Sequence, residues 1–125
     1  MTFAGRRTVT VLLVEDAPET RHVLTELLEM QGLRVVAAAT AEEALAAGTQ
    51  ARSDSIDLLL ADLHLPDGNG GQVASSLKRR HPHMRSLFLS GESDPKLGPD
   101  QAFLRKPAGI ATILGQIRAL LPQSA

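Results

Sequence analysis

Short apolar runs alternate with segments of helical periodicity along most of the chain. The runs are rich in Leu, Val and Ala and show no polar alternation, which is typical of strands buried on both faces of a sheet. They predict strands at residues 9–14, 33–38, 56–61, 86–89 and 102–105. Strands that alternate with helices indicate an α/β fold, in which a doubly wound parallel sheet is covered on both faces.

The first and last predicted helices carry the clearest apolar stripes. The first begins near Pro18, because proline suits the first turn of a helix, and ends at Gly32. The last covers residues 110–121. The two stripes comprise Val23, Leu24, Leu27, Leu28 and Met30 in the first helix, and Ile110, Ile113, Leu114, Ile117, Leu120 and Leu121 in the last.

Two further helices are indicated by the residues at their ends. Thr40 and Glu43 form a capping box, which opens a helix that reaches about Ala51. A run of turn residues over 66–71 precedes another helix, which extends to about His81.

Length and composition limit the possible functions. The chain of 125 residues fits one domain, with a flexible leader at 1–8 and the domain at 9–122. A net charge of -1 and the absence of Trp and Tyr disfavour direct nucleic acid binding. The absence of Cys excludes disulfides and thiolate sites. The run at 9–14 is too short to cross a bilayer, so we expect a cytoplasmic protein without membrane insertion.

Polar side chains come directly after four of the predicted strands. They are the pair Glu15 and Asp16, then Asp62, Ser90 and Lys106. Each of them alone would usually be an ordinary turn residue, but each falls directly after its own strand. The carboxyl ends of parallel strands meet at one edge of a sheet, where ligands bind. We therefore expect these side chains to share one site.

Three carboxylates at one edge repel each other unless a cation lies between them. A set made of carboxylate oxygens suits Mg²⁺, whereas Ca²⁺ takes more oxygen ligands and zinc favours His or Cys. A carboxylate can also act as a nucleophile toward phosphorus. Mg²⁺, the ammonium of Lys106 and the hydroxyl of Ser90 would then neutralise the three equatorial oxygens of a transferred phosphoryl group.

Four segments carry a family likeness: VLLVEDAPETRHVLTELLEMQG, DLLLADLHLPDGNGGQV, SLFLSGES and AFLRKP. They resemble the receiver domains of two-component response regulators, over residues 10–121, and the last two are especially similar to receivers of hybrid histidine kinases. The resemblance implies a flavodoxin-like receiver fold with five strands. It also implies a switch that takes its phosphoryl group from a histidine kinase or a histidine phosphotransfer protein. Such a domain catalyses only its own phosphorylation and dephosphorylation, so we do not class it as an enzyme, and it is compatible with a place in a longer hybrid kinase.

The resemblance also implies roles for single residues. Asp62 is the phosphoacceptor. Asp16, Asp62 and the backbone carbonyl of His64 bind Mg²⁺ directly, and Glu15 acts through a metal-bound water. Lys106 contacts the phosphoryl group, and a cis bond is expected between it and the following proline.

Three further positions are implied to govern switching and lifetime. Ser90 matches the switch hydroxyl, and Phe103 matches the switch aromatic residue. His64 lies two residues after the acceptor and Glu92 two residues after Ser90, and the family tunes the lifetime of the aspartyl phosphate at such positions.

The segment between Ser90 and Phe103 departs from the family pattern. It is shorter than usual and contains two prolines and two glycines, which oppose helix formation. We therefore expect the family's fourth helix to be shortened or absent. Because many DNA-binding relatives dimerise through that helix, we expect a monomer or a weak dimer.

Other functions remain as alternatives. A pseudo-receiver that serves only as an interaction module would not need the complete set of site residues found here. A phosphatase with an aspartyl nucleophile would favour a second acid two residues after it, where this chain has His64. A flavin-binding module of similar topology is disfavoured because the chain has no Trp or Tyr for stacking.

Overall fold

All five predicted strands are present and form one parallel sheet in the order β2–β1–β3–β6–β7. The computed structural model describes residues 8–50, 56–91 and 96–121. The strands of this sheet are β1 (Thr10–Val14), β2 (Arg34–Ala38), β3 (Leu58–Asp62), β6 (Arg85–Ser90) and β7 (Gln101–Arg105). The helices are α1 (Pro18–Met30), α2 (Ala41–Gln50), α3 (Gly70–Lys78) and α4 (Ile110–Leu120). The doubly wound five-stranded fold is therefore confirmed.

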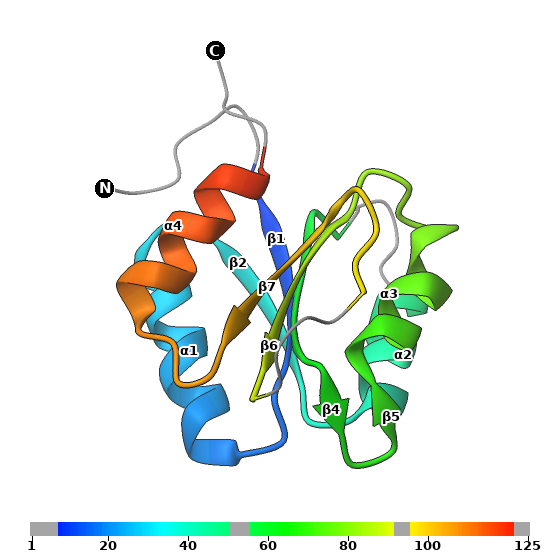
Figure 1. Ribbon diagram of the computed structural model, residues 1–125, viewed down its shortest axis with the longest axis horizontal. Coiled ribbons are helices and arrows are strands. Elements are labelled where there is room, and N and C mark those ends of the chain that lie inside the picture. The colour runs from blue at the N-terminus through cyan, green and yellow to red at the C-terminus, as the bar shows by residue number, and fades with distance from the viewer. Residues whose placement is uncertain (1–7, 51–55, 92–95, 122–125) are drawn as a thin grey trace.

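The helices cover the two faces of the sheet in pairs (Figure 1). Helices α1 and α4 lie on one face, and α2 and α3 lie on the other. A separate apolar core fills each interface. Because both faces are covered, every residue of the central strands β1 and β3 is buried, which explains why their sequences show no polar alternation.

Some predicted boundaries were wrong by one to three residues. Asp62 and Ser90 are the last residues of β3 and β6 rather than the first residues beyond them. Pairing with the neighbouring strand extends each strand, since Asp62 lies opposite Leu89 and Ser90 opposite Arg105. Helix α3 ends at Lys78. Ala51, the expected end of the second helix, lies outside the described residues.

The apolar stripe of α1 is narrower than its sequence suggested. Leu24 and Leu28 are buried against the sheet, whereas Val23 and Met30 are 53% and 72% exposed. Residues four apart share one face of a helix, and a single sheet surface covers only that face. Gly32 follows the helix with a φ of 88°, a backbone conformation that glycine adopts readily.

The turn signal after β3 folds into a small hairpin that the sequence did not predict. Strands β4 (His64–Leu65) and β5 (Gly68–Asn69) pair antiparallel, and they are too short to leave an alternating pattern. At the tip, Asp67 accepts hydrogen bonds from the backbone N–H groups of Ala41 and Glu42 at 2.8 and 3.0 Å. The hairpin is therefore joined to the N-terminus of α2, and these bonds hold the pKa of Asp67 below its usual value.

The capping box of α2 is confirmed in part. The Thr40 hydroxyl accepts from the backbone N–H of Glu43 at 3.1 Å. The Glu43 carboxylate accepts from the backbone N–H of Ala39, one residue earlier than in the usual motif.

The connection from β6 to β7 lacks the usual helix as far as the structure describes it. Gly91 and residues 96–100 contain no helical residue, which agrees with the expected shortening of the family's fourth helix. The expected leader lies outside the described residues except for Thr8. None of the helices described is long and apolar enough to cross a membrane.

Candidate phosphoacceptor site

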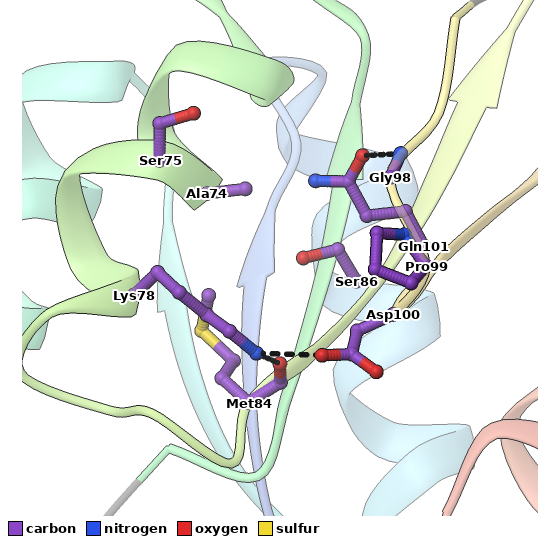
Figure 2. A pocket seen from close by; sticks show the side chains of 9 residues that line it. All are labelled: Ala74, Ser75, Lys78, Met84, Ser86, Gly98, Pro99, Asp100 and Gln101. Carbon is purple, nitrogen blue, oxygen red and sulfur yellow. Dashed lines mark hydrogen bonds and ion pairs between the residues drawn. The ribbon is translucent and has the colours of Figure 1, made fainter.

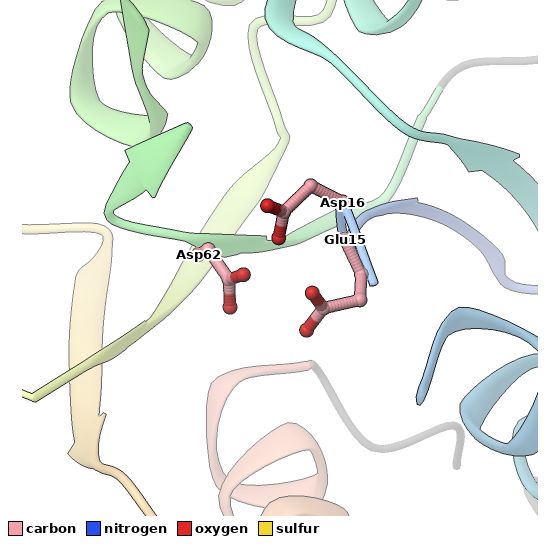
Figure 3. Close-up of side chains that lie close together, drawn as sticks. All are labelled: Glu15, Asp16 and Asp62. Carbon is pink, nitrogen blue, oxygen red and sulfur yellow. The ribbon is translucent and has the colours of Figure 1, made fainter. Parts of the chain in front are cut away.

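Three carboxylates meet where the strand order of the sheet reverses. Glu15 and Asp16 directly follow β1, and Asp62 ends the adjacent strand β3. One carboxylate oxygen from each residue lies within 4.8 Å of the others, and Figure 3 shows the three side chains converging. Glu15 and Asp62 are only 4% and 3% exposed, so like charges are crowded in a site with little water. The structure thus brings together the three carboxylates that the sequence placed at the ends of two strands.

Backbone contacts fix the acidic loop after β1. The Glu15 carboxylate accepts a hydrogen bond from the N–H of Ala17 at 3.0 Å. Arg21, in the first turns of α1, donates to the carbonyls of Glu15 and Asp16 at 2.9 and 3.3 Å. Sequence reasoning missed Arg21. A cation one turn inside the helix that follows an acidic pair was the available signal.

The crowding changes the proton affinity of Glu15. Burial, followed by the charge of Asp62 and the hydrogen bonds shared with Asp16 and Asp62, raises the pKa of Glu15 to about 7, against the opposing effect of the Ala17 N–H. Part of the Glu15 population is therefore protonated near neutral pH. A divalent cation in the site would displace that proton.

Lys106 provides the positive charge that faces the cluster. It directly follows β7, and its Nζ lies 2.9 Å from Asp62 Oδ1. Desolvation by burial lowers the pKa of Lys106, but contact with Asp62 and the charges of Glu15 and Asp16 outweigh this effect and raise it above its usual value. The ammonium therefore stays charged. The Lys106–Pro107 bond is cis, as the family resemblance implies.

The two expected switch residues lie on β6 and β7. Ser90 is 2% exposed and follows Leu89, the residue paired with Asp62. Its backbone carbonyl accepts from the N–H of Lys106 at 2.8 Å. Phe103 is partly buried and lies opposite the buried Phe88.

The loop after Asp62 passes very close to the backbone of that residue. A Cβ atom on Gly70 would lie 2.8 Å from the carbonyl oxygen of Asp62, so this position requires glycine. His64 is exposed, as expected for a residue at the rim of the site. Its carbonyl as a metal ligand stays a prediction, and Glu92 lies outside the described residues.

The residues present fit a magnesium ion. Glu15, Asp16 and Asp62 offer only carboxylate oxygens, and Mg²⁺ is bound in proteins through one or two carboxylates and retained waters. Asp16 is exposed while Glu15 and Asp62 are buried, so one side of the cluster is open to water.

This sheet, with an acidic cluster at its switch point and a lysine facing it, defines a receiver domain. A family model described as the response regulator receiver domain matches residues 11–117. The chain belongs to that family, whose members act in two-component systems and generally bind Mg²⁺.

The relatives include both transcriptional regulators and kinases. The chain is 36% identical over 119 residues to the transcriptional regulatory protein CpxR of Escherichia coli, covering 91% of this chain and 50% of CpxR. It is 28% identical to the sensor kinase CckA of Brucella abortus, covering 90% of this chain and 12% of CckA. The crystal structure of the receiver domain from the hybrid histidine kinase CckA aligns with a TM-score of 0.80 at 29% identity, covering 90% and 99% of the two chains. The chain therefore spans about half the length of the transcriptional regulators it matches.

Proposed function

We propose that this receiver accepts a phosphoryl group on Asp62 in a Mg²⁺-dependent reaction and acts as a conformational switch. The donor is a histidine kinase or a histidine phosphotransfer protein. The observation that carries the proposal is the buried Asp62 carboxylate, which lies beside two further acids and 2.9 Å from the Lys106 ammonium.

The arrangement supports a direct transfer. A carboxylate oxygen of Asp62 forms the new O–P bond, and the N–P bond to the donor histidine breaks, with the electron pair staying on the imidazole nitrogen. Mg²⁺ would be held by Asp16, Asp62 and the carbonyl of His64, and by Glu15 through water, and it would neutralise charge on the phosphoryl oxygens. Lys106 leaves its ion pair with Asp62 for the phosphoryl group.

Ser90 and Phe103 convert the phosphoryl transfer into a change of conformation. The hydroxyl of Ser90 moves to donate a hydrogen bond to a second phosphoryl oxygen. The displacement of Ser90 at the end of β6 frees space, so Phe103 turns inward from β7. The switch then changes the surface of β7 and α4. His64 and Glu92 adjust the lifetime of the aspartyl phosphate by their access to the attacking water.

We propose that the domain performs no turnover on an external substrate. Its catalysis is limited to its own phosphorylation and dephosphorylation, because the acceptor keeps the group until water removes it. A phosphatase of the aspartyl type would need an acid where the exposed His64 stands. A pseudo-receiver would not need Lys106 in contact with Asp62.

An open pocket beside Asp16 and Lys106 supports docking of the phosphodonor. A cavity of about 590 Å³ lies between α1 and the start of α4, with Asp16 and Lys106 at one side and Leu24, Leu89 and Ile113 among its apolar lining. A donor could therefore bury apolar side chains here while its histidine reaches Asp62.

Phosphorylation is tested with acetyl phosphate and Mg²⁺, followed by intact-protein mass. We expect one added phosphoryl group on the wild type and on Asp67→Asn, and none on Asp62→Asn. Asp67 is a suitable control because it lies five residues away in the same loop and is exposed, and Asn keeps an oxygen for the α2 cap. Equal labelling of Asp62→Asn and wild type would refute the assignment of Asp62.

The place of the domain in signalling is a separate proposal. We propose a cytoplasmic, kinase-attached or phosphorelay receiver that remains a monomer or weak dimer when activated and does not bind nucleic acid directly. The helix-free residues described between β6 and β7 and the similarity to a hybrid-kinase receiver support it. Sedimentation of the beryllofluoride-activated protein measures its oligomeric state. A tight dimer whose interface maps to residues 91–121 would contradict the proposal of a monomer or weak dimer.

A further inference from the structure

A second cavity lies at the other end of β6 from the acceptor. It has a volume of about 170 Å³ and opens between α3 and the segment that enters β7 (Figure 2). Ser86, near the start of β6, forms its floor, and Ser90 ends the same strand. At about 3.3 Å per residue, the cavity is about 13 Å from the switch hydroxyl. It is therefore separate from the site described above.

The floor of this cavity is polar. Ser86 is only 3% exposed, and Figure 2 shows its hydroxyl directed into the space beneath α3. Its backbone N–H donates to the carbonyl of Asp100. Within the part of the chain that the structure describes, its hydroxyl has no hydrogen-bond partner. The hydroxyl oxygen is not among the described side-chain atoms that are both buried and without a partner, so it is accessible from the cavity and can bond to a ligand there.

One wall carries a lysine with a donor to spare. Lys78 Nζ donates to the carbonyl of Met84 at 2.7 Å and to Asp100 Oδ2 at 3.1 Å. An ammonium group has three N–H donors, so one remains. The Asp100 carboxylate also binds Arg85, so two cations share one anion and the group carries a net charge of about +1.

The opposite wall adds an oriented amide. The side-chain oxygen of Gln101 accepts from the backbone N–H of Gly98 at 2.8 Å. This bond turns the amide nitrogen of Gln101, a double donor, toward the cavity (Figure 2). Ser86, Lys78 and Gln101 thus present three kinds of donor to one space. Among the described residues that line it, the one carboxylate, Asp100, is already bound by two cations.

The remaining lining consists of Ser75, which is exposed on α3, and several apolar residues. Ala74 comes from α3, Met84 from the turn before β6 and Pro99 from the segment before β7. An apolar cavity of about 150 Å³ can hold benzene, which has six non-hydrogen atoms. A cavity of similar size suits a ligand of that size, with one anionic end and a short alkyl chain.

We propose that this cavity binds a short-chain monocarboxylate. The carboxylate accepts hydrogen bonds from Ser86, Gln101 and Lys78, and the alkyl chain lies against Ala74, Met84 and Pro99. Butyrate, with six non-hydrogen atoms, has the required size and charge. Since Ser86 pairs with Gln101 and Phe88 with Phe103 along the same two strands, a ligand here would lie on the sheet face that also carries the expected switch aromatic residue.

Sodium butyrate is the probe, added to the unphosphorylated, metal-free protein and followed by NMR. We expect saturable shifts of the backbone amides of residues 86 and 98–101 and of the Met84 methyl group. Butyramide, which has the same size without the charge, should bind at least tenfold more weakly, and sodium chloride at equal ionic strength should give no saturable shift. Equal binding of butyrate and butyramide, or butyrate shifts spread over the whole surface, would overturn the proposal.

Two variants test the donors. Ser86→Ala removes the floor hydroxyl with almost no change in size, and it should weaken butyrate binding about tenfold, the effect of losing one hydrogen bond to a charged group. Lys78→Gln should weaken it at least as much, while the exposed Lys96→Gln should leave it unchanged. An unchanged affinity in Ser86→Ala would refute the site even if Lys78→Gln fails to fold. No outcome depends on Asp62, so the test is independent of phosphorylation.

Discussion

The two ends of the central strand β3 both contain buried polar side chains, but they use them differently. Near the amino end of β3, His81 is 2% exposed. Its Nδ1 accepts from the N–H of Ile56 at 3.0 Å, and its Nε2 lies 2.8 Å from the carbonyl of Gly48. Asp57 is 8% exposed and accepts from the N–H of Thr10 at 2.8 Å. Each of these side chains completes the hydrogen bonding of the backbone around it.

At the carboxyl end, the buried groups face one another instead. Glu15 and Asp62 are nearly as buried as His81, yet they form a cluster of like charges opposed by Lys106. Like charges this close together raise the free energy of the folded protein. Burial of a polar residue therefore identifies function only together with its partners: backbone partners indicate a structural role, and like charges indicate a binding site.

The largest expected difference between the two ends concerns stability. His81→Ala should lower the free energy of unfolding by about 3 kcal/mol, because it leaves a backbone N–H and a carbonyl without partners in the interior. Asp62→Asn should leave stability unchanged or raise it, since it removes one of the crowded charges. Urea unfolding followed by circular dichroism measures both, as the chain has no Trp.

The exposed His83→Ala is the matched control for His81 and should change stability by less than about 0.5 kcal/mol. A loss of stability in Asp62→Asn as large as that in His81→Ala would remove the distinction between the two ends.

The second prediction separates two groups at the carboxyl end. Lys106→Ala should lose more of the switching response than Ser90→Ala, because it removes a full charge facing the phosphoryl group, whereas the serine contributes one hydrogen bond. The response is measured as NMR shifts at Phe103 on adding beryllofluoride with Mg²⁺. Lys96→Ala, at an exposed site away from the cluster, is the control, and a stronger loss in Ser90→Ala would contradict the prediction.

The third prediction concerns pH. In the metal-free protein, the raised pKa of Glu15, about 7, means that the folded state holds this proton more tightly than the unfolded state, so the contribution of Glu15 to stability is present below about pH 4.5 and is lost as pH rises to about 7. Mg²⁺ favours the ionised carboxylate, so its affinity should rise roughly tenfold from pH 6 to pH 8.

NMR titrations with Mg²⁺ at pH 6, 7 and 8 give this affinity. Glu15→Gln should flatten the pH dependence, and Glu19→Gln, at an exposed position in α1, should keep it. A flat profile for the wild type would show that Glu15 does not release a proton when the metal binds.

The smallest expected effects are on the lifetime of the aspartyl phosphate. His64→Ala and Glu92→Ala should change the dephosphorylation rate a few-fold without preventing phosphorylation, since they lie two residues after Asp62 and Ser90 in the sequence and neither supplies the nucleophile. The rates follow from the decay of the phosphorylated mass in intact protein. Unchanged rates in both variants would make these two residues ordinary surface positions.

The sequence by itself determined which segments along the chain form strands and helices, and it identified most residues of the acidic site. Uninterrupted apolar runs identified the buried strands because both faces of the sheet are covered. The position of Glu15, Asp16 and Lys106 after their strands was enough to bring them together, because parallel strands place their carboxyl ends at one edge. The proline- and glycine-rich composition after Ser90 likewise predicted a shortened or absent helix, and the described residues of that connection, Gly91 and 96–100, are not helical.

Only the tertiary structure decided which polar residues support the fold. His81 and Asp57 are bound to backbone groups that lie 25 and 47 residues away in the chain, and no local pattern encodes such partners. Arg21 and Asp67 likewise act on backbone groups of other elements. The cavity beneath α3 exists because three separate segments meet around Ser86. Periodicity reports which face of an element is buried, whereas a hydrogen-bond partner or a cavity depends on which elements become neighbours in space.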